Sequence, residues 1–280
     1  MTEVFSLYRW AIFAGLIGAI NLALIGCHLA ARDRAMQTLC LGQGATLGVL
    51  IGLGILAPLH FSETLYHYFP ILTAFLMTAI VYLISQKISQ KRLASKNTFF
   101  ALTFAILLGL SYLASSVFPS LEVHVTQLFF GDLATVTDRD ALAVITLSVL
   151  SLIALGQNSR LFSHLSFQIA IFGDSILKSR EKTSDQLFNA ICLVTLAFTI
   201  QFMGFLFTIS CLFIPTGILR STKHAGLGRH FILSSMAAGI GTVTGFMMSV
   251  ANGNLPTVPT VVLAITLVSL GLLATEGHSS

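Results

Sequence analysis

Long apolar stretches that are almost free of Asp, Glu, Lys and Arg alternate with short polar segments along the chain. A helix that crosses a bilayer needs about 20 apolar residues, because every backbone polar group must be bonded within the segment. The stretches of this kind are 10–31, 37–59, 70–86, 98–118, 141–157, 185–219 and 231–275. The last two are too long for one crossing. The pattern therefore predicts an all-α, polytopic membrane protein with eight or nine transmembrane helices.

Turn-forming residues divide the two longest stretches. Within 231–275, the segment Asn252-Gly253-Asn254-Leu255-Pro256 combines the residue types that are typical of turns. Within 185–219, we expect the chain to fold back near Gln201-Phe202-Met203-Gly204, which would leave two short helices. The whole chain, 1–280, is interpreted as a single transmembrane domain.

Positive charges fall on alternate loops between the predicted helices. They are Arg32, Arg34, Lys87, Lys91, Arg92, Lys96, Arg160, Lys178, Arg180, Lys182, Arg220, Lys223 and Arg229. Cytoplasmic loops retain Lys and Arg, so these loops are predicted to be cytoplasmic. The other loops are 59–69, 119–140 and 252–256, and the one Lys or Arg residue that they contain is Arg139. The first helix then begins outside the cell and the chain, a multi-pass membrane protein, ends in the cytoplasm.

The composition excludes several classes of protein. Of the 280 residues, 55% are hydrophobic and only 9% are charged, whereas a soluble domain carries about 25% charged residues. This excludes a soluble enzyme, a disordered chain and a nucleic-acid-binding domain. The four cysteines lie within apolar runs and are interpreted as small core residues: Cys27, Cys40, Cys192 and Cys211.

Small residues recur four positions apart on two of the predicted helices. They are Gly44, Gly48 and Gly52 on one helix, and Ala237, Gly241 and Gly245 on the other. Small residues at this spacing let helix backbones approach closely within a membrane. The pattern favours packing between helices or a subunit contact over a ligand contact.

Catalytic chemistry is not visible in the sequence. A phosphate-binding GxxxxGK[ST] loop, an HExxH helix, a GxSxG elbow and a CxxC motif are all absent, so we expect no catalytic residue and no cofactor. The helix centres hold neutral polar groups such as Asn21, Gln43, Asn189 and Gln201. Because ion-driven carriers usually have a buried ionisable group, the energy for any transport would come from another subunit.

The segment 158–183 is long for a loop in so hydrophobic a chain. It combines an apolar stretch (Leu165, Phe167, Ile169, Ile171 and Phe172) with basic residues that follow it. One interpretation is an amphipathic segment that docks into a groove of a soluble partner. The other is an interfacial helix that rests on the lipid headgroups.

Three segments resemble a known family. Residues 127–137 (QLFFGDLATVT), followed by Asp138 and Asp140, resemble the "LFGD-L-A-V-(S/T)" stretch of the zinc, manganese and iron permeases. These permeases are the membrane subunits of bacterial ABC importers for divalent metals. Residues 212–217 (LFIPTG) are similar to that family's "L-I-P-A-A-T-A-R" helix, and residues 254–263 (NLPTVPTVVL) to its "D-L-P-x-G-x-x-I-V-L". With the span count, these matches in family order cover nearly the whole chain.

The resemblance implies a homodimeric, multi-pass permease of a bacterial inner membrane, surrounded by membrane lipid. No nucleic-acid partner is expected, because the composition excludes one. Cytoplasmic ATP-binding subunits would bind residues 160–183, and an extracytoplasmic solute-binding protein would deliver the substrate. Ser166 and Phe167 match the start of the family's coupling segment, and Gly173 stands nearest to the glycine that follows it.

The second predicted helix departs from the family pattern. Leu39, Gly42 and Gln43 stand where the family has an acidic residue, Ser and His, and Asn254 replaces the acid of "D-L-P". Zn²⁺ and Mn²⁺ prefer imidazole nitrogen and carboxylate oxygen, so either the substrate is no bare divalent ion or its ligands come from elsewhere. The residues that would line the path by family position are Thr38, Gln43, Thr46 and Asn254.

Candidate metal ligands lie in the predicted outer loops. His60, Glu63 and His67 are spaced to share one helical face, and the next outer loop holds Glu122, His124 and Asp132. Together they would form an outer rim that handles metal. The alternative is that the histidines lie near helix ends with their polar tips at the membrane interface.

These observations favour a permease subunit of an ABC importer for zinc, manganese or iron, or a complex of the metal. It would work by alternating access and would not itself be an enzyme, because a separate subunit would hydrolyse ATP. The alternatives are a secondary carrier for a small neutral solute and a membrane scaffold that transports nothing.

Overall fold

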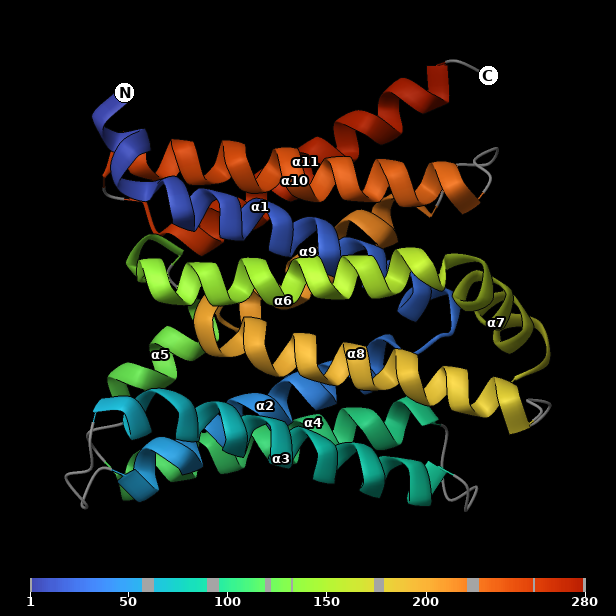
Figure 1. The fold of residues 1–280 in the computed structure, drawn as a ribbon, viewed down its shortest axis with the longest axis horizontal. Helices are drawn as coiled ribbons and strands as arrows, with labels where there is room; N and C mark the ends of the chain where they lie inside the picture. The colour runs from blue at the N-terminus through green and yellow to red at the C-terminus, as the bar shows by residue number, and fades with distance from the viewer. Residues whose placement is uncertain are drawn as a thin grey trace. The chain divides into compact units, whose positions relative to one another are not determined.

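The computed structural model describes residues 2–56, 63–89, 96–118, 122–131, 133–173, 179–220, 227–253 and 255–278. In this part the chain is helical and holds no strand (Figure 1). The helices are α1 (Thr2–Ala31), α2 (Ala35–Leu56), α3 (Glu63–Ser89), α4 (Lys96–Val117), α5 (Glu122–Phe130), the 3₁₀ helix η2 (Leu133–Thr135), α6 (Asp138–Gln157), α7 (Ser159–Phe172), α8 (Ser179–Met203), α9 (Phe205–Leu219), α10 (Leu227–Asn252) and α11 (Thr257–His278). Eight of them are long and apolar enough to cross a membrane, which confirms the predicted all-α, polytopic fold.

Glycines end the helices where the two longest apolar stretches were expected to divide. Gly204 separates α8 from α9 and has φ +89°, a conformation that residues with a Cβ rarely adopt. Gly253 has φ +63° and follows the end of α10. The prediction of two short helices in 185–219 is confirmed only for α9, which has 15 residues, because α8 extends over 25.

The first compact unit comprises Met1–Asp33, Asp132–Cys192 and Leu206–Ser280. Within it, α1 packs against α6, α7 and α10, and α10 packs against α11. The small residues predicted to mediate packing on α10 lie at its contact with α11. A Cβ on Gly241 would lie 2.5 Å from Cα of Ile265, and a Cβ on Gly245 would lie 2.5 Å from Cα of Val261. The two helix backbones therefore touch, as the spacing predicts.

The second compact unit comprises Arg34–Gly131 and Leu193–Phe205. Within it, α2 packs against α3, α4 and α5. Gly48 lies against α3, where an added Cβ would be 2.5 Å from the carbonyl oxygen of Thr73 and 2.7 Å from Cα of Ala74. Gly204 lies directly against the backbone of Gly131. The buried core of the unit is built from Ala45, Val49, Leu50, Ala74, Val125, Leu128, Ala197 and Ile200.

Candidate functional site

The predicted path residues of α2 are buried. The hydroxyls of Thr38 and Thr46 donate to carbonyl oxygens of their own helix, at Arg34 (2.9 Å) and Gly42 (3.1 Å). Gln43 instead reaches another helix, because its Nε2 donates to Oγ of Ser111 on α4 at 3.1 Å. The amide oxygen Oε1 of Gln43 is buried and has no hydrogen-bond partner among the residues that the structure describes. Asn254, the fourth predicted path residue, lies outside the described residues.

The surroundings of Gly42 are aromatic and apolar. A Cβ added to Gly42 would lie 3.0 Å from the ring of Phe205 and 3.3 Å from Cδ1 of Ile200. The ring of Phe205 also packs near those of Phe104 and Phe129, with centroids 6.3 and 5.9 Å away. The serine that the resembling family has at this position would therefore meet the Phe205 ring. Bulky apolar groups fill the space beside Gly42, whereas Gln43 and the Cys40 thiol, which donates to the carbonyl oxygen of Phe100, make polar contacts with α4.

The outer-rim metal candidates are only partly described. His124 is exposed on α5. Glu63 and His67 belong to α3 and Glu122 begins α5, but their side chains, like His60 and Asp132, lie outside the described residues. Among the residues that are described, the structure groups no three His, Cys, Asp or Glu side chains that would hold a metal ion. The rim therefore stays a prediction.

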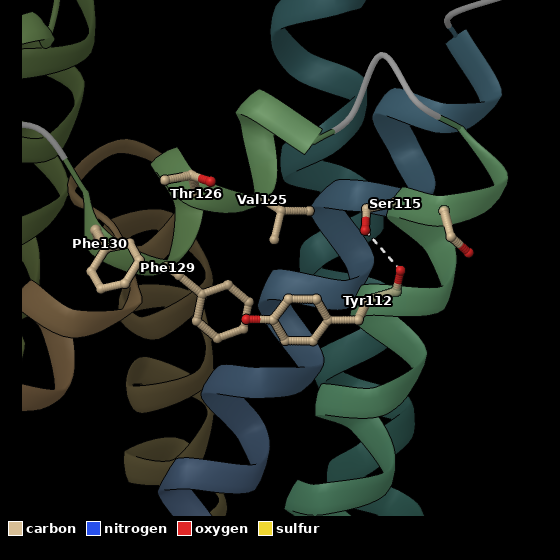
Figure 2. Close-up of a pocket in the computed structure, with 7 residues that line it drawn as sticks. Tyr112, Ser115, Val125, Thr126, Phe129 and Phe130 are labelled. Carbon is tan, nitrogen blue, oxygen red and sulfur yellow. Dashed lines mark hydrogen bonds between the residues drawn. The ribbon is translucent and has the colours of Figure 1, made fainter.

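A hollow of about 470 Å³ lies between α4 and α5. Figure 2 shows the ring of Tyr112 facing that of Phe129, and the two are stacked with centroids 6.1 Å apart. The other lining residues are Ser115, Ser116, Val125, Thr126 and Phe130. Its lining offers aromatic faces and hydroxyl groups but no imidazole or carboxylate, so it is not suited to binding a metal ion.

Helix α7 has one buried face and one exposed face, and it accounts for the first part of the predicted coupling segment 158–183. Phe162, Leu165, Ser166 and Ile169 are buried. Phe167, Ile171 and Phe172 are 65, 55 and 58% exposed. Gly173, with φ +74°, ends the helix and is exposed. Of the three predicted coupling residues, Phe167 and Gly173 therefore face outward, whereas Ser166 lies on the buried face.

Sequence reasoning missed the partners of Ser166. Its hydroxyl oxygen lies 2.9 Å from Nε of Arg32, directly after α1, and 3.0 Å from Nδ1 of His28, in the last turn of α1. Arg32 lies in the turn after α1, where the loop-charge pattern placed it, but its side chain is completely buried and not exposed to solvent. It pairs with Asp185 at 2.7 Å. The sequence feature that could have indicated this ion pair is Asp185 itself, an acidic residue at the first position of the apolar stretch 185–219.

Eight apolar helices long enough to cross a membrane define the class as a multi-pass membrane protein. The chain belongs to the ABC 3 transport family, which it matches over residues 4–276. This match confirms the resemblance found in the three sequence motifs.

The structure is also similar to a chain of PsaBC from Streptococcus pneumoniae in complex with Fab. The TM-score is 0.73 and the sequence identity is 16%, over 94% of this chain and 89% of that chain. At this identity the likeness concerns the fold. No curated protein matches the chain.

Proposed function

We propose that the chain is the permease subunit of an ABC importer that moves a divalent metal ion (zinc, manganese or iron), or a complex of that metal, into the cytoplasm of a bacterium. ATP-binding subunits supply the energy, and the permease exposes its path to one side of the membrane at a time. The chain's membership of the ABC 3 transport family supports this proposal. The structural observation that carries it is the exposed apolar face of α7.

Helix α7 has the features of a docking helix for an ATP-binding subunit. It is too short, at 14 residues, to cross a membrane, and it lies in the chain between the apolar spans α6 and α8. Phe167 and Ile171 are four residues apart, so they share one face of the helix and would insert together into a groove. Leu165 and Ile169 hold the opposite face in the protein.

Gln43 is the best candidate for a contact with the substrate in transit. Its Oε1 is a buried acceptor to which no described residue donates, and a carbonyl oxygen is a ligand that Mn²⁺ accepts. A single neutral oxygen binds a cation weakly, and weak binding suits a step through which the ion must pass. The family resemblance supplies the other partners: a second copy of the chain and an extracytoplasmic solute-binding protein that delivers the metal.

The test is transport by the purified chain with the ATPase that is encoded beside it. We expect the two to co-purify, and proteoliposomes that hold both, with the solute-binding protein added, to take up radioactive zinc, manganese or iron only when ATP is supplied. Gln43→Ala should lower uptake about tenfold while ATPase binding is unchanged. A Thr78→Val variant, which loses a bond to the carbonyl oxygen of Ala74 within α3 at a buried position outside the predicted path, is the matched control and should lower uptake less.

The alternatives give different results in the same assay. Uptake of a neutral solute without ATP would support a secondary carrier and refute the proposal. A chain that binds no ATPase and transports nothing under any condition would support a scaffold.

A further inference from the structure

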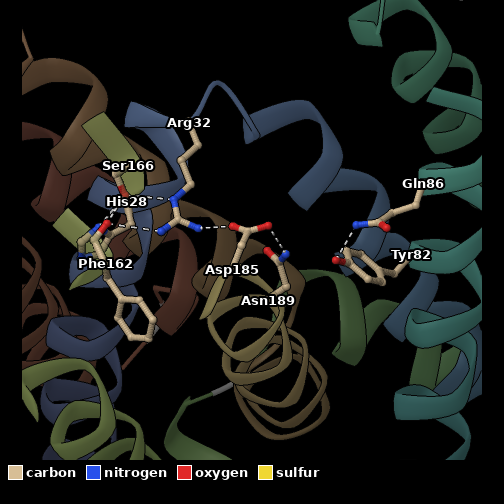
Figure 3. Close-up of polar contacts among 8 residues, drawn as sticks. All are labelled: His28, Arg32, Tyr82, Gln86, Phe162, Ser166, Asp185 and Asn189. Atoms are coloured by element: carbon tan, nitrogen blue, oxygen red, sulfur yellow. Dashed lines mark hydrogen bonds and ion pairs between the residues drawn. The ribbon is translucent and has the colours of Figure 1, made fainter. Parts of the chain in front are cut away.

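A buried cluster of polar and charged side chains joins three helices of the first compact unit. It consists of His28 from the last turn of α1, Arg32 directly after α1, Ser166 from α7, and Asp185 and Asn189 from α8, and it is called the Arg32 cluster below. Figure 3 shows the guanidinium of Arg32 between Ser166 and Asp185. The cluster contains a buried ion pair, Arg32 with Asp185, in a chain whose predicted helix centres hold neutral polar groups.

Arg32 bonds to both neighbouring helices at once. Its Nε donates to Oγ of Ser166 at 2.9 Å, and its Nη1 donates to Oδ1 of Asp185 at 2.7 Å. Its Nη2 lies 3.4 Å from the carbonyl oxygen of Phe162, which is one helical turn before Ser166 on α7. A guanidinium is the side chain that can do this, because its donors point in several fixed directions. Arg32 thus binds α7 through two groups and α8 through the carboxylate.

The remaining bonds of the cluster fix the two partners of Arg32. The second carboxylate oxygen of Asp185 accepts from Nδ2 of Asn189 at 3.0 Å. The hydroxyl of Ser166 donates to the carbonyl oxygen of Phe162 at 2.8 Å, so its oxygen is free to accept from Arg32 and from His28. The guanidinium also lies 4.0 Å above the ring of Phe188. Buried charges with this many partners hold one arrangement of their helices rather than several.

The position of Ser166 gives the cluster its functional meaning. Ser166 is 2% exposed, and the next residue, Phe167, is 65% exposed on the proposed docking face. The inward face of the same helix turn is therefore tied to α1 and α8. A second polar contact between α7 and α8 is longer and half-buried: Nε2 of Gln168 lies 3.4 Å from Oε1 of Glu181. If a bound subunit displaced α7 at Phe167, the bonds of the Arg32 cluster would be the most direct connection by which α1 and α8 would move with it.

We propose that Arg32 is the positioning residue that couples α7 to the membrane-spanning helices α1 and α8. Movement of α7 by an ATP-binding subunit is then passed to these spans through the bonds of Arg32 to Ser166, Phe162 and Asp185. This inference rests on the proposed function, because it assumes that α7 is the docking helix. It predicts that loss of the cluster separates ATP hydrolysis from transport.

The test uses the full chain with its ATP-binding subunits and solute-binding protein in proteoliposomes. Three quantities are measured: basal ATP hydrolysis, its stimulation by the loaded solute-binding protein, and uptake of radioactive zinc, manganese or iron per ATP hydrolysed. The variants are Ser166→Ala, Arg32→Lys and the double variant Arg32→Met/Asp185→Leu. Arg139→Met is the matched control, because Arg139 is an exposed arginine at the start of α6.

We expect each cluster variant to keep its ATP-binding subunits and its basal hydrolysis within about twofold of the wild type. Uptake per ATP should fall about tenfold in the double variant and about threefold in Ser166→Ala, and stimulation should fall with it. Arg32→Lys should also lower uptake per ATP, because the lysine ammonium supplies the positive charge without the fixed donor directions of the guanidinium. Arg139→Met should match the wild type.

Wild-type uptake per ATP in Ser166→Ala and in Arg32→Lys would overturn the inference while leaving the proposed function intact. Ser166→Ala keeps this test decisive if the double variant does not fold, because it removes one hydroxyl and leaves both charges paired. A wild-type chain that binds no ATP-binding subunit would overturn the proposed function, and this inference with it.

Discussion

The close contact between α10 and α11 predicts that one added methyl group at Gly245 destabilises the protein. A Cβ there would lie 2.5 Å from Cα of Val261, 2.9 Å from its nitrogen and 3.0 Å from the carbonyl oxygen of Thr260. Carbon atoms in contact are about 3.5–4.0 Å apart. All three neighbours are backbone atoms that cannot rotate away, so the two helices would have to separate by about 1 Å.

The expected size of the effect follows from two opposing terms. Overpacking a tight contact costs about 1–3 kcal/mol, and backbone neighbours place Gly245→Ala near the upper value. Replacing Gly by Ala within a helix gains about 1 kcal/mol. We therefore expect Gly245→Ala to lower the free energy of unfolding by about 2 kcal/mol. Gly271→Ala, on α11 with nothing within 4 Å of an added Cβ, should raise it by about 1 kcal/mol.

The measurement is equilibrium unfolding in mixtures of mild detergent and dodecyl sulfate, followed by the fluorescence of Trp10. It is the single tryptophan of the chain and lies on α1, which packs against α10. Gly241→Ala should behave like Gly245→Ala, because its Cβ would meet Cα of Ile265 at 2.5 Å. The double variant should lose less than the sum of the two losses, because one separation of the helices relieves both contacts. Equal stability of Gly245→Ala and Gly271→Ala, or strict additivity, would refute the reasoning.

Three further predictions concern the docking helix, the buried ion pair and the break between α8 and α9. Phe167→Asp should abolish co-purification of the ATP-binding subunit without changing unfolding, because the side chain is 65% exposed; retained binding would contradict the docking role of α7. Arg32→Met should lower the free energy of unfolding by about 3–5 kcal/mol, because it leaves the charge of Asp185 buried without its cation. The double variant Arg32→Met/Asp185→Leu should recover most of this loss. Equal losses for the single and the double variant in the same unfolding assay would show that the pair is not buried. Gly204→Ala should prevent accumulation of folded protein, because φ is +89° and a Cβ would overlap Gly131; a wild-type yield in gel filtration would contradict this.

The spans could be predicted from the sequence because the bilayer sets the composition of each span without reference to its neighbours. The glycines on α10 could be assigned to packing for a similar reason, since close approach of backbones requires small residues at regular spacing. The faces of α7 were within reach as well. Leu165 and Ile169 are four residues apart and point inward, and Phe167 and Ile171 share the outward face, so the helical period separates residues that a composition count treats as one apolar stretch.

The Arg32 cluster was beyond the sequence for a physical reason. Loop charges report the side of the membrane on which a loop lies, but not whether a side chain turns back into the protein. Arg32 and Asp185 are 153 positions apart, and each stands at the edge of an apolar stretch where a solvated charge is the usual case. Only packing of α1 beside α7 and α8 makes burial of both charges favourable. The aromatic surroundings of Gly42 depend in the same way on which helices meet at α2.

The packing of α1 against α10 also sets the order in which the protein can be completed during its synthesis. Helix α10 begins at Leu227, whereas α1 ends at Ala31. A ribosome that adds about 5–20 residues per second needs roughly 10–40 s to make the chain between them. Over that time α1 lies in the membrane without the neighbour that covers much of its length. The pair α2 and α3, which follow one another in the chain, can instead close as soon as both have been inserted.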